Sequence, residues 1–229
     1  MSRASLEWDG DVAVIRMQHE ENRFHPEMLA AIDDALDEVE GREGPAAVVI
    51  TGEGKFFSNG LDLDYLGSAP EGDPAKILVD VHRLFARLLG FPTATIAALN
   101  GHVFAAGAML ALACDQRVMR EDRGFLCLPE VDLGIPFTPG MNALIAGRLS
   151  PATAHEAMLT GRRYGGHDAV DAGIVDAAVA EDAVVSEATA RAAELAGKPR
   201  DAVAAIKGRL YEDALAALTS DDTGLPGVT

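Results

Sequence analysis

The stretch KFFSNGLDLDYL, residues 55–66, decides how this chain can fold. It follows AAVVIT at 46–51, an apolar and β-branched run that predicts a buried strand. The small residues Ser58, Asn59 and Gly60 predict a tight turn, and the acidic and apolar residues after them predict a helix start. A helix start leaves backbone N–H groups without a partner. We therefore expect the backbone of this turn, rather than its side chains, to carry a function.

A second stretch, IAALNGHVFAAGAMLALACD at 96–115, repeats this order. It predicts a buried strand over 93–99, a turn at Asn100 and Gly101, and a closely packed helix over 105–115. Each turn alone is more often a simple strand-to-helix connection. Brought together, the two turns would direct unpaired N–H groups and the positive ends of helix dipoles at a developing oxyanion.

The rest of the sequence predicts one α/β domain with a helical C-terminal third. We expect a core over 1–195 and a C-terminal helical segment over 196–229 that serves in trimerisation. The further elements expected are a hairpin over 5–17 with Asp9-Gly10 as its turn, helices over 25–40 and 73–89, strands over 116–119 and 124–128, and helices from 151 onward with a strand near 173–179.

The composition limits the possible partners. The chain has 229 residues, 48% of them hydrophobic, which is enough for a substantial core. Its 36 acidic and 19 basic residues give a charge of −17, and no basic run is present, so nucleic acid is not an expected partner. No apolar run reaches the ~18 residues of a membrane span, so no membrane partner is expected. Cys114 and Cys127 lie in apolar stretches, which predicts buried free thiols in a reducing cytoplasm.

Several cofactor motifs are absent from the sequence. TGEGK at 51–55 lacks the earlier glycine of a phosphate-binding loop, and Phe56 replaces its Ser or Thr. The six histidines show no metal-ligand spacing, and Ser58 is not in a nucleophile elbow. For His102, which follows the second turn, we expect a packing role. We predict no metal and no separate cofactor.

One acidic residue is a candidate general base. Glu130 lies in LCLPEVDLGIPFTPG at 126–140, between an apolar strand and an apolar, proline-rich loop. Poor solvation there would raise the pKa of its carboxyl group toward that of a useful base. The alternatives are a surface glutamate at a strand end, and Asp132 as the competing acid.

Four segments together resemble the crotonase, or enoyl-CoA hydratase/isomerase, superfamily, most closely its plant-type Δ3,Δ2-enoyl-CoA isomerases. They are KFFSNGLDL, IAALNGHVFAAGAMLALACD, PEVDLGI and LTGRRYGGHDAVDAGIVDAAV, and the similarity extends over residues 5 to about 215. The resemblance implies a crotonase (ClpP-like) fold of repeated ββα units. It also implies an acyl-CoA substrate whose coenzyme A is part of the substrate, a role in fatty acid β-oxidation, and a homotrimer or homohexamer.

The resemblance assigns the chemistry to three positions. The oxyanion-hole amides fall on Leu61 and Ala106, and the glutamate of the P-E segment falls on Glu130. Family hydratases carry a second glutamate where this chain has Met109. One remaining carboxylate is what an isomerase needs to move a proton from C2 to C4. A hydratase or another thioester-enolate enzyme is the alternative, and a protein that binds CoA thioesters without turnover is the alternative outside enzymes.

Further residues are candidates for substrate contacts. We expect the acyl pocket to involve Met109, Leu133 and Phe137. The substrate-binding turn residues are Ser58, Asn59, Gly60 and Asp62. The candidates for the CoA phosphates are Arg23, Lys55 and Lys207, the last of these toward a neighbouring subunit.

Overall fold

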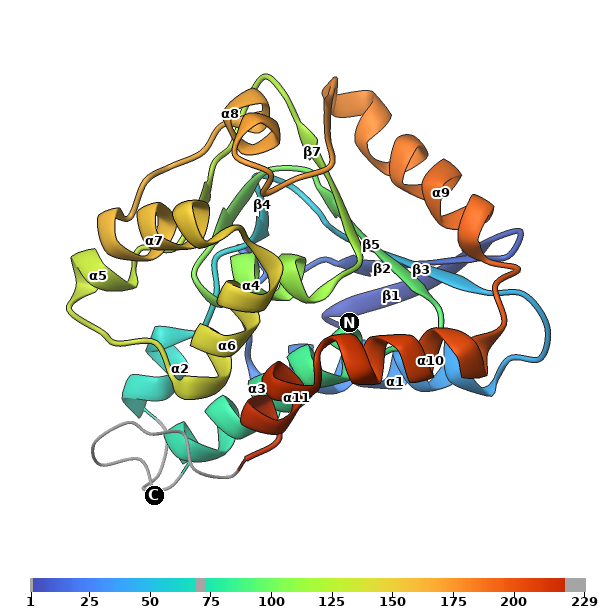
Figure 1. Cartoon of the computed structure of the whole chain (residues 1–229), viewed down its shortest axis with the longest axis horizontal. Helices are drawn as coiled ribbons and strands as arrows, with labels where there is room; N and C mark the ends of the chain where they lie inside the picture. The colour runs from blue at the N-terminus through green and yellow to red at the C-terminus, as the bar shows by residue number, and fades with distance from the viewer. Residues whose placement is uncertain (1, 69–72, 221–229) are drawn as a thin grey trace.

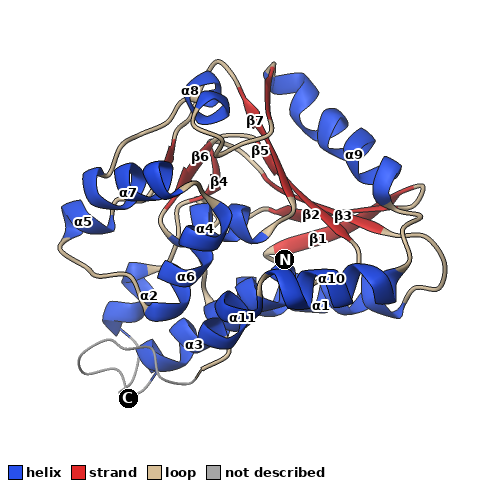
Figure 2. Ribbon diagram, in the orientation of Figure 1, coloured by secondary structure: helices blue, strands red, loops and turns tan. Residues whose placement is uncertain are grey.

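The computed structural model describes residues 2–68 and 73–220, whose strands form two sheets (Figures 1 and 2). The strands are β1 (Ala4–Asp9), β2 (Val12–Met17), β3 (Ala47–Gly52), β4 (Phe56–Ser58), β5 (Ala94–Leu99), β6 (His102–Phe104), β7 (Gln116–Arg120), β8 (Leu126–Cys127) and β9 (Ala177–Val179). The helices are α1 (Pro26–Gly41), α2 (Leu63–Ser68), α3 (Asp73–Leu89), α4 (Ala106–Ala113), α5 (Glu130–Leu133), α6 (Pro139–Arg148), α7 (Pro151–Thr160), α8 (Gly166–Asp171), the 3-10 turn η1 (Glu181–Ala183), α9 (Val184–Leu195), α10 (Arg200–Leu210) and α11 (Glu212–Leu218).

The chain repeats a ββα unit. The six-stranded sheet has the order β1-β2-β3-β5-β7-β9, and the three-stranded sheet has the order β4-β6-β8. In the units β3-β4-α2, β5-β6-α4 and β7-β8-α5, the first strand joins the large sheet and the second joins the small sheet. Apart from the antiparallel hairpin β1-β2, the strand pairs are parallel. The repeated ββα fold is therefore confirmed.

The large sheet is covered on both faces, which explains why β3 and β5 are apolar at almost every position. Val48 and Ile50 of β3 face a core that also contains the buried sides of α1, α3 and α4, whereas Ala47 and Val49 face α9. Figure 2 shows α9 on one side of the sheet and α1 with α3 on the other. Parallel strands that are buried on both faces have continuous apolar sequences, rather than sequences in which apolar and polar residues alternate.

Helix α4 is enclosed on all sides, and its position is fixed at both ends. All eight of its residues are buried. At its C-terminal end, Arg148 donates to the carbonyl oxygens of Leu112 and Cys114 at 2.9 and 2.8 Å, and Arg117 donates to that of Cys114 at 3.0 Å. Guanidinium groups at a helix C-terminus satisfy its last carbonyls and complement its dipole. Its N-terminus is thereby held against the first turn.

The predicted elements agree with the structure apart from small shifts. The hairpin is present, but its strands end at Asp9 and begin again at Val12, so Gly10, with φ +59°, and Asp11 form the turn instead of Asp9-Gly10. The predicted strand near 173–179 shortens to β9, because the residues before it close the end of α8. Cys114 and Cys127 are buried free thiols, as predicted.

The described part of the C-terminal segment packs on its own subunit. Helix α9 ends at Leu195 and α10 begins at Arg200, on either side of the predicted boundary, and α11 lies against α6 and α3 (Figure 1). Residues 221–229 lie outside the described residues. None of the described helices combines the length and apolarity needed to cross a membrane.

Candidate active site

The two turns of small residues meet at the N-terminus of α4. A methyl group added to Gly60 would lie 3.0 Å from the Cβ atom of Ala105 and 3.2 Å from the nitrogen of Ala106. A Cβ atom at Gly107 would lie 2.6 Å from the carbonyl oxygen of Ser58. The turns are therefore packed backbone to backbone, and only glycine fits at these two positions.

The first turn is fixed by a neighbouring segment of backbone. The amide of Phe24 donates to the oxygen of Gly60 at 2.7 Å, and the amide of Asp62 donates to the oxygen of Phe24 at 3.2 Å. The hydroxyl of Ser58 donates to the oxygen of Asn22 at 2.7 Å. The amide of Leu61 lies between these bonded groups and donates to no acceptor within residues 2–68 and 73–220.

The second turn leaves a matching donor. Ala105 precedes α4 with φ +50°, a left-handed conformation that is strained for alanine. Its carbonyl oxygen accepts hydrogen bonds from the amides of Ala108 and Met109. Ala106 is the first residue of the helix, and its amide has no acceptor in the described part of the chain. Strain stored beside two unpaired donors is typical of a functional site.

A cavity of about 260 Å³ opens onto both amides. The predicted site residues that line it are Asn59, Leu61, Ala106, Met109, Glu130 and Leu133. Its wall is mostly apolar, with residues from the helices α2, α3, α4, α5 and α6 and from the strands β6 and β8. A cavity of this kind suits an apolar group attached to a polar reacting centre.

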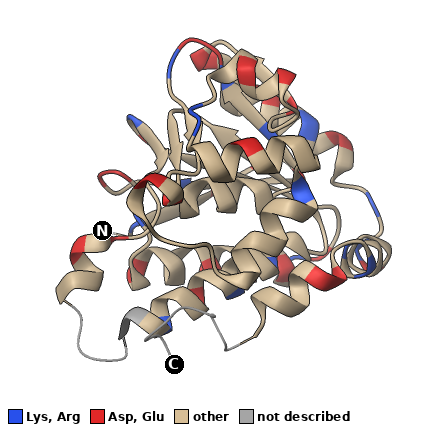
Figure 3. Ribbon diagram, turned by 60° about the vertical axis from the view of Figure 1, so that its left-hand side comes forward, with Lys and Arg blue, Asp and Glu red and all other residues tan. Residues whose placement is uncertain are grey.

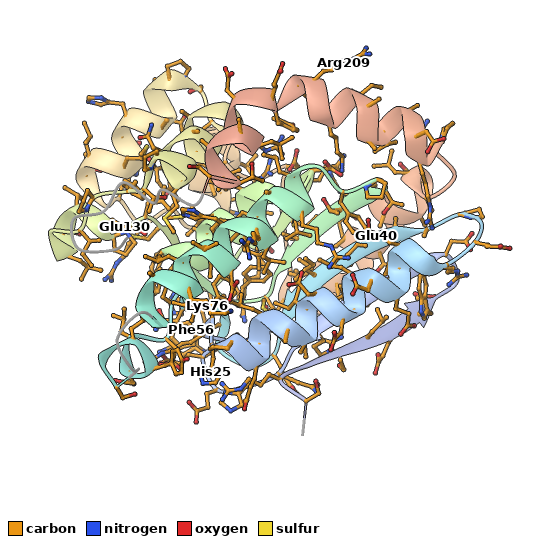
Figure 4. All side chains as sticks on the ribbon, turned by 90° about the horizontal axis from the view of Figure 1, so that it is seen from below. His25, Glu40, Phe56, Lys76, Glu130 and Arg209 are labelled. Atoms are coloured by element: carbon orange, nitrogen blue, oxygen red, sulfur yellow. The ribbon has the colours of Figure 1, made fainter. Side chains whose placement is uncertain are left out.

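Glu130 supplies the carboxylate of the cavity (Figure 4). It begins α5, after Leu128 and Pro129 have connected this helix to strand β8, and it is 8% exposed. Burial raises the pKa of its carboxyl group from 4.5 to about 7, although a hydrogen bond from its own backbone opposes the shift. Its Oε2 atom has no hydrogen-bond partner among the described residues. A desolvated carboxylate with a free oxygen and a pKa near neutrality is suited to act as a general base.

Four of the predicted substrate-binding residues have a different role or position. Ser58 is fully buried and hydrogen-bonded, and Gly60 is needed for its conformation, with φ +82°. The carboxylate of Asp62 accepts the amide of Tyr65 at 3.1 Å and so caps α2. Phe137 packs against the core, while Pro136 and Thr138 on either side of it line the cavity.

The three predicted phosphate ligands lie in different places. Arg23 borders a second hollow of about 410 Å³, but it pairs with Glu21 at 2.8 Å and Asp64 at 2.9 Å. Lys55 is exposed beside the ring of Phe56.

Lys207, the third, is buried in its own subunit. It bonds to the oxygen of Thr93 at 3.0 Å and pairs with Asp115 at 2.6 Å. This position does not support its predicted role toward a neighbouring subunit.

Sequence reasoning missed part of the cavity wall. The residues it did not single out include Leu63, Leu78, Phe104, Cys127, Thr138 and Arg163. Arg163 lies within LTGRRYGG, one of the segments that resemble the family, but nothing in this segment indicates that its side chain lines the cavity. Leu78 comes from α3, and only the tertiary structure shows which face of that helix meets the cavity.

No metal site accompanies these residues. In residues 2–68 and 73–220, no three His, Cys, Asp or Glu side chains are arranged as metal ligands.

The fold brings two unpaired backbone amides and one desolvated carboxylate to a single apolar cavity, an arrangement suited to a protein that binds and activates a carbonyl compound. Residues 7–222 match the family model described as enoyl-CoA hydratase/isomerase. The chain is 38% identical over 219 residues to "Enoyl-CoA delta isomerase 3" of Arabidopsis thaliana, covering 91% of this chain and 92% of that protein. It is 37% identical over 193 residues to a "Putative enoyl-CoA hydratase" of Thermus thermophilus, covering 82% and 75%.

A solved structure agrees with these relatives. The human mitochondrial delta3-delta2-enoyl-CoA isomerase superimposes with a TM-score of 0.90 at 26% identity, covering 99% of this chain and 89% of that chain. The chain belongs to the enoyl-CoA hydratase/isomerase family. The predicted family and crotonase fold are confirmed.

Proposed function

We propose that this chain is a Δ3,Δ2-enoyl-CoA isomerase, which converts a 3-enoyl-CoA into the conjugated trans-2-enoyl-CoA. The observation that carries the proposal is that one desolvated carboxylate, Glu130, shares a cavity with the two unpaired amides of Leu61 and Ala106. The isomerase names of the Arabidopsis relative and of the human structure support the same reaction.

The reaction begins with removal of a proton from C2 of the substrate. The thioester oxygen accepts hydrogen bonds from the amides of Leu61 and Ala106, and Glu130 takes the C2 proton. The electron pair of that C–H bond forms the C1–C2 double bond of an enolate, and the negative charge moves to the thioester oxygen. Donors fixed before the reaction stabilise that charge without reorganisation, and this is commonly the largest catalytic contribution.

The reaction ends with return of the proton at C4. The enolate C1–C2 electrons form the C2–C3 double bond, and the former C3–C4 double bond supplies the pair that takes the proton from Glu130. The carboxylate is restored, so one group serves as base and then as acid. A pKa of about 7 suits both roles near neutral pH, because the acid and base forms are then similarly populated.

Met109 separates this reaction from hydration. It is fully buried on α4 and lines the cavity close to the Ala106 amide. A thioether neither accepts a proton at neutral pH nor holds an attacking water as a carboxylate does. The name of the Thermus relative supports the alternative of a hydratase. In that case, this chain would have to hydrate its substrate without a second carboxylate at position 109.

The test compares two substrates with the wild type and with Met109→Glu. We expect the wild type to consume 3-enoyl-CoA and to hydrate 2-enoyl-CoA little. Met109→Glu should gain a small, measurable hydration rate, because a new and unsupported carboxylate positions water poorly, and an error near 1 Å costs about 10²-fold. Chromatography of the acyl-CoA products measures both reactions, with isomerisation as the internal control. Rapid hydration by the wild type would reject Met109 as the discriminating residue and favour the hydratase.

The coenzyme A part of the substrate is proposed to lie along residues 59–63, which separate the cavity from the second hollow. Asn59, Leu61 and Leu63 line the cavity, while Asp62 lines the hollow that Arg23 borders. Because Arg23 is already paired with Glu21 and Asp64, a phosphate must displace a carboxylate to use it. If the protein instead bound CoA thioesters without turnover, they would raise its Tm while 3-enoyl-CoA remained unchanged.

Assembly and compartment belong to the same proposal. The family resemblance supports a homotrimer or homohexamer, and α10 exposes Ile206 and Leu210, one turn apart, on one face. Light scattering of the purified protein gives the mass that decides between the monomer, the trimer and the hexamer.

We propose a cytoplasmic enzyme on the basis of the free thiols. A relative of 35% identity is named as peroxisomal, so microscopy of the tagged protein is the test.

A further inference from the structure

Arg163 is a charged residue on an otherwise apolar part of the cavity wall. It lines the same cavity as Leu61, Ala106 and Glu130. No carboxylate within residues 2–68 and 73–220 lies within ion-pairing distance of its guanidinium group. Its neighbour Arg162, in contrast, donates two hydrogen bonds of 3.0 Å to Glu156. An unpaired guanidinium at the wall of a binding cavity is available to a ligand.

The small sheet fixes where Arg163 lies. Phe104 of β6 and Cys127 of β8 are partners in the strand register, and Leu126 exchanges two hydrogen bonds of 2.9 Å with Tyr164. Tyr164 is buried, whereas Arg163, Phe104 and Cys127 all line the cavity. The guanidinium carbon lies 5.9 Å from the centre of the Phe104 ring, within cation–π range. The exposed side chain of Arg163 therefore lies at the Phe104 end of the cavity, where the cavity meets solvent.

Two other basic residues, Lys55 and Arg123, act on the same histidine as Arg163. Burial lowers the pKa of His102, and the charges of Lys55, Arg123 and Arg163 lower it further. None of these three cations has an ion-pair partner among the described residues. The chain as a whole carries a charge of −17, and its acidic positions are spread over its helices and loops (Figure 3). Burial raises the pKa of Cys127, the charge of Arg163 opposes this shift, and Glu130 and Asp132 add to it. Glu121 and Asp122 border a neighbouring hollow together with His102 and Arg123, but among the described residues neither is paired with Arg163.

We propose that Arg163 recognises a carboxylate at the far end of the acyl chain, so that the cavity accepts acyl-CoA esters of dicarboxylic acids. This inference rests on the proposed function for one point, which is that the thioester lies at the amides of Leu61 and Ala106. An acyl chain that starts there and follows the apolar wall toward Phe104 brings its end to Arg163. A guanidinium binds a carboxylate through two parallel hydrogen bonds, whereas a methyl end would leave the cation without a partner.

The test measures binding of saturated ligands, which the enzyme cannot isomerise. Hexanedioyl-CoA and octanedioyl-CoA are compared with hexanoyl-CoA and octanoyl-CoA by calorimetry. At one of the two chain lengths, the wild type should bind the dicarboxylic ester about tenfold more tightly, as expected for a partly exposed charged hydrogen bond. Arg163→Leu should remove this preference. Arg162→Leu, in which the neighbouring paired arginine is lost, should keep it.

Two results would overturn the inference. One is a wild type with no preference for the dicarboxylic ester at either length. The other is an Arg163→Leu variant that weakens all four ligands equally, because Arg163 would then contact the coenzyme A part common to them. Since none of these ligands reacts, the outcome is independent of isomerase turnover, which the assay with 3-enoyl-CoA reports separately.

Discussion

Glu130→Gln should lower kcat for 3-enoyl-CoA isomerisation by at least about 10³-fold while the affinity for the substrate changes little. Glutamine keeps the shape of the side chain in its 8% exposed position but cannot take a proton from C2. In the wild type, kcat/KM should fall about tenfold per pH unit below the pKa of about 7, because only the ionised carboxylate is a base. Steady-state kinetics across pH 5–8 measure both effects.

Protein stability provides the control for this variant. Burial raises the pKa of Glu130, so the folded protein binds more protons than the unfolded chain between about 4.5 and 7, and stability falls as the pH rises through that window. Keeping the buried carboxylate ionised lowers the free energy of unfolding by an amount on the order of 3 kcal/mol at pH 8, and glutamine, which does not ionise, avoids this loss. The Tm of Glu130→Gln should therefore be no lower than that of the wild type at pH 8. Near-normal isomerisation by the folded variant would assign the base to Asp132 or to another group.

Leu61→Pro should lower kcat for isomerisation by at least about 10²-fold because it removes one of the two oxyanion donors. Proline has no backbone N–H, and the Leu61 amide has no acceptor in the described structure, so the change breaks no internal hydrogen bond. Loss of one such donor costs about 3–4 kcal/mol in the transition state, or roughly 10²- to 10³-fold in kcat. Single-turnover kinetics measure the loss.

Leu61→Ala is the matched control for the proline variant. It shortens the side chain and retains the amide, so most of the turnover should remain. Circular dichroism must show that both variants are folded. If the folded proline variant kept full activity, the Leu61 amide would have no part in the chemistry.

The fold was largely predictable because local patterns and tertiary structure agree. The apolar runs at 46–51 and 93–99 are strands buried on both faces, and the small residues of α4 match its complete enclosure. The errors lie where local signals were weak. The hairpin turn shifted by one residue because Asp9 and Asp11 both flank Gly10, and either can accompany glycine in a two-residue turn.

The site was predictable where the backbone or the surrounding chain sets the chemistry. The turns indicated unpaired amides, the family resemblance assigned them to Leu61 and Ala106, and the cavity contains both residues together with Glu130, whose apolar flanks indicated a raised pKa. The assignments that depended on long side chains were less successful. Nothing local to Arg23 or Lys207 indicates that Asp64 and Asp115, distant in sequence, pair with them.

Side-chain direction explains the remaining misses. In the loop before α6, Phe137 turns into the core, while Pro136 and Thr138 line the cavity. Arg163 becomes a cavity residue only because the backbone of Tyr164 pairs with Leu126. Such pairings join residues far apart in the chain, so the sequence near Arg163 carries no sign of them.

In the proposed mechanism, a single carboxylate moves the proton from C2 to C4. The most direct test supplies the wild type with 3-enoyl-CoA that carries deuterium at both C2 positions, and locates the label in the first-formed product by NMR. Because Glu130 is 8% exposed, its acquired deuteron should exchange slowly with water, and a substantial fraction should appear at C4 of trans-2-enoyl-CoA. A 2-enoyl product whose C4 carries only solvent hydrogen at the earliest times, or no 2-enoyl product at all, would contradict the account.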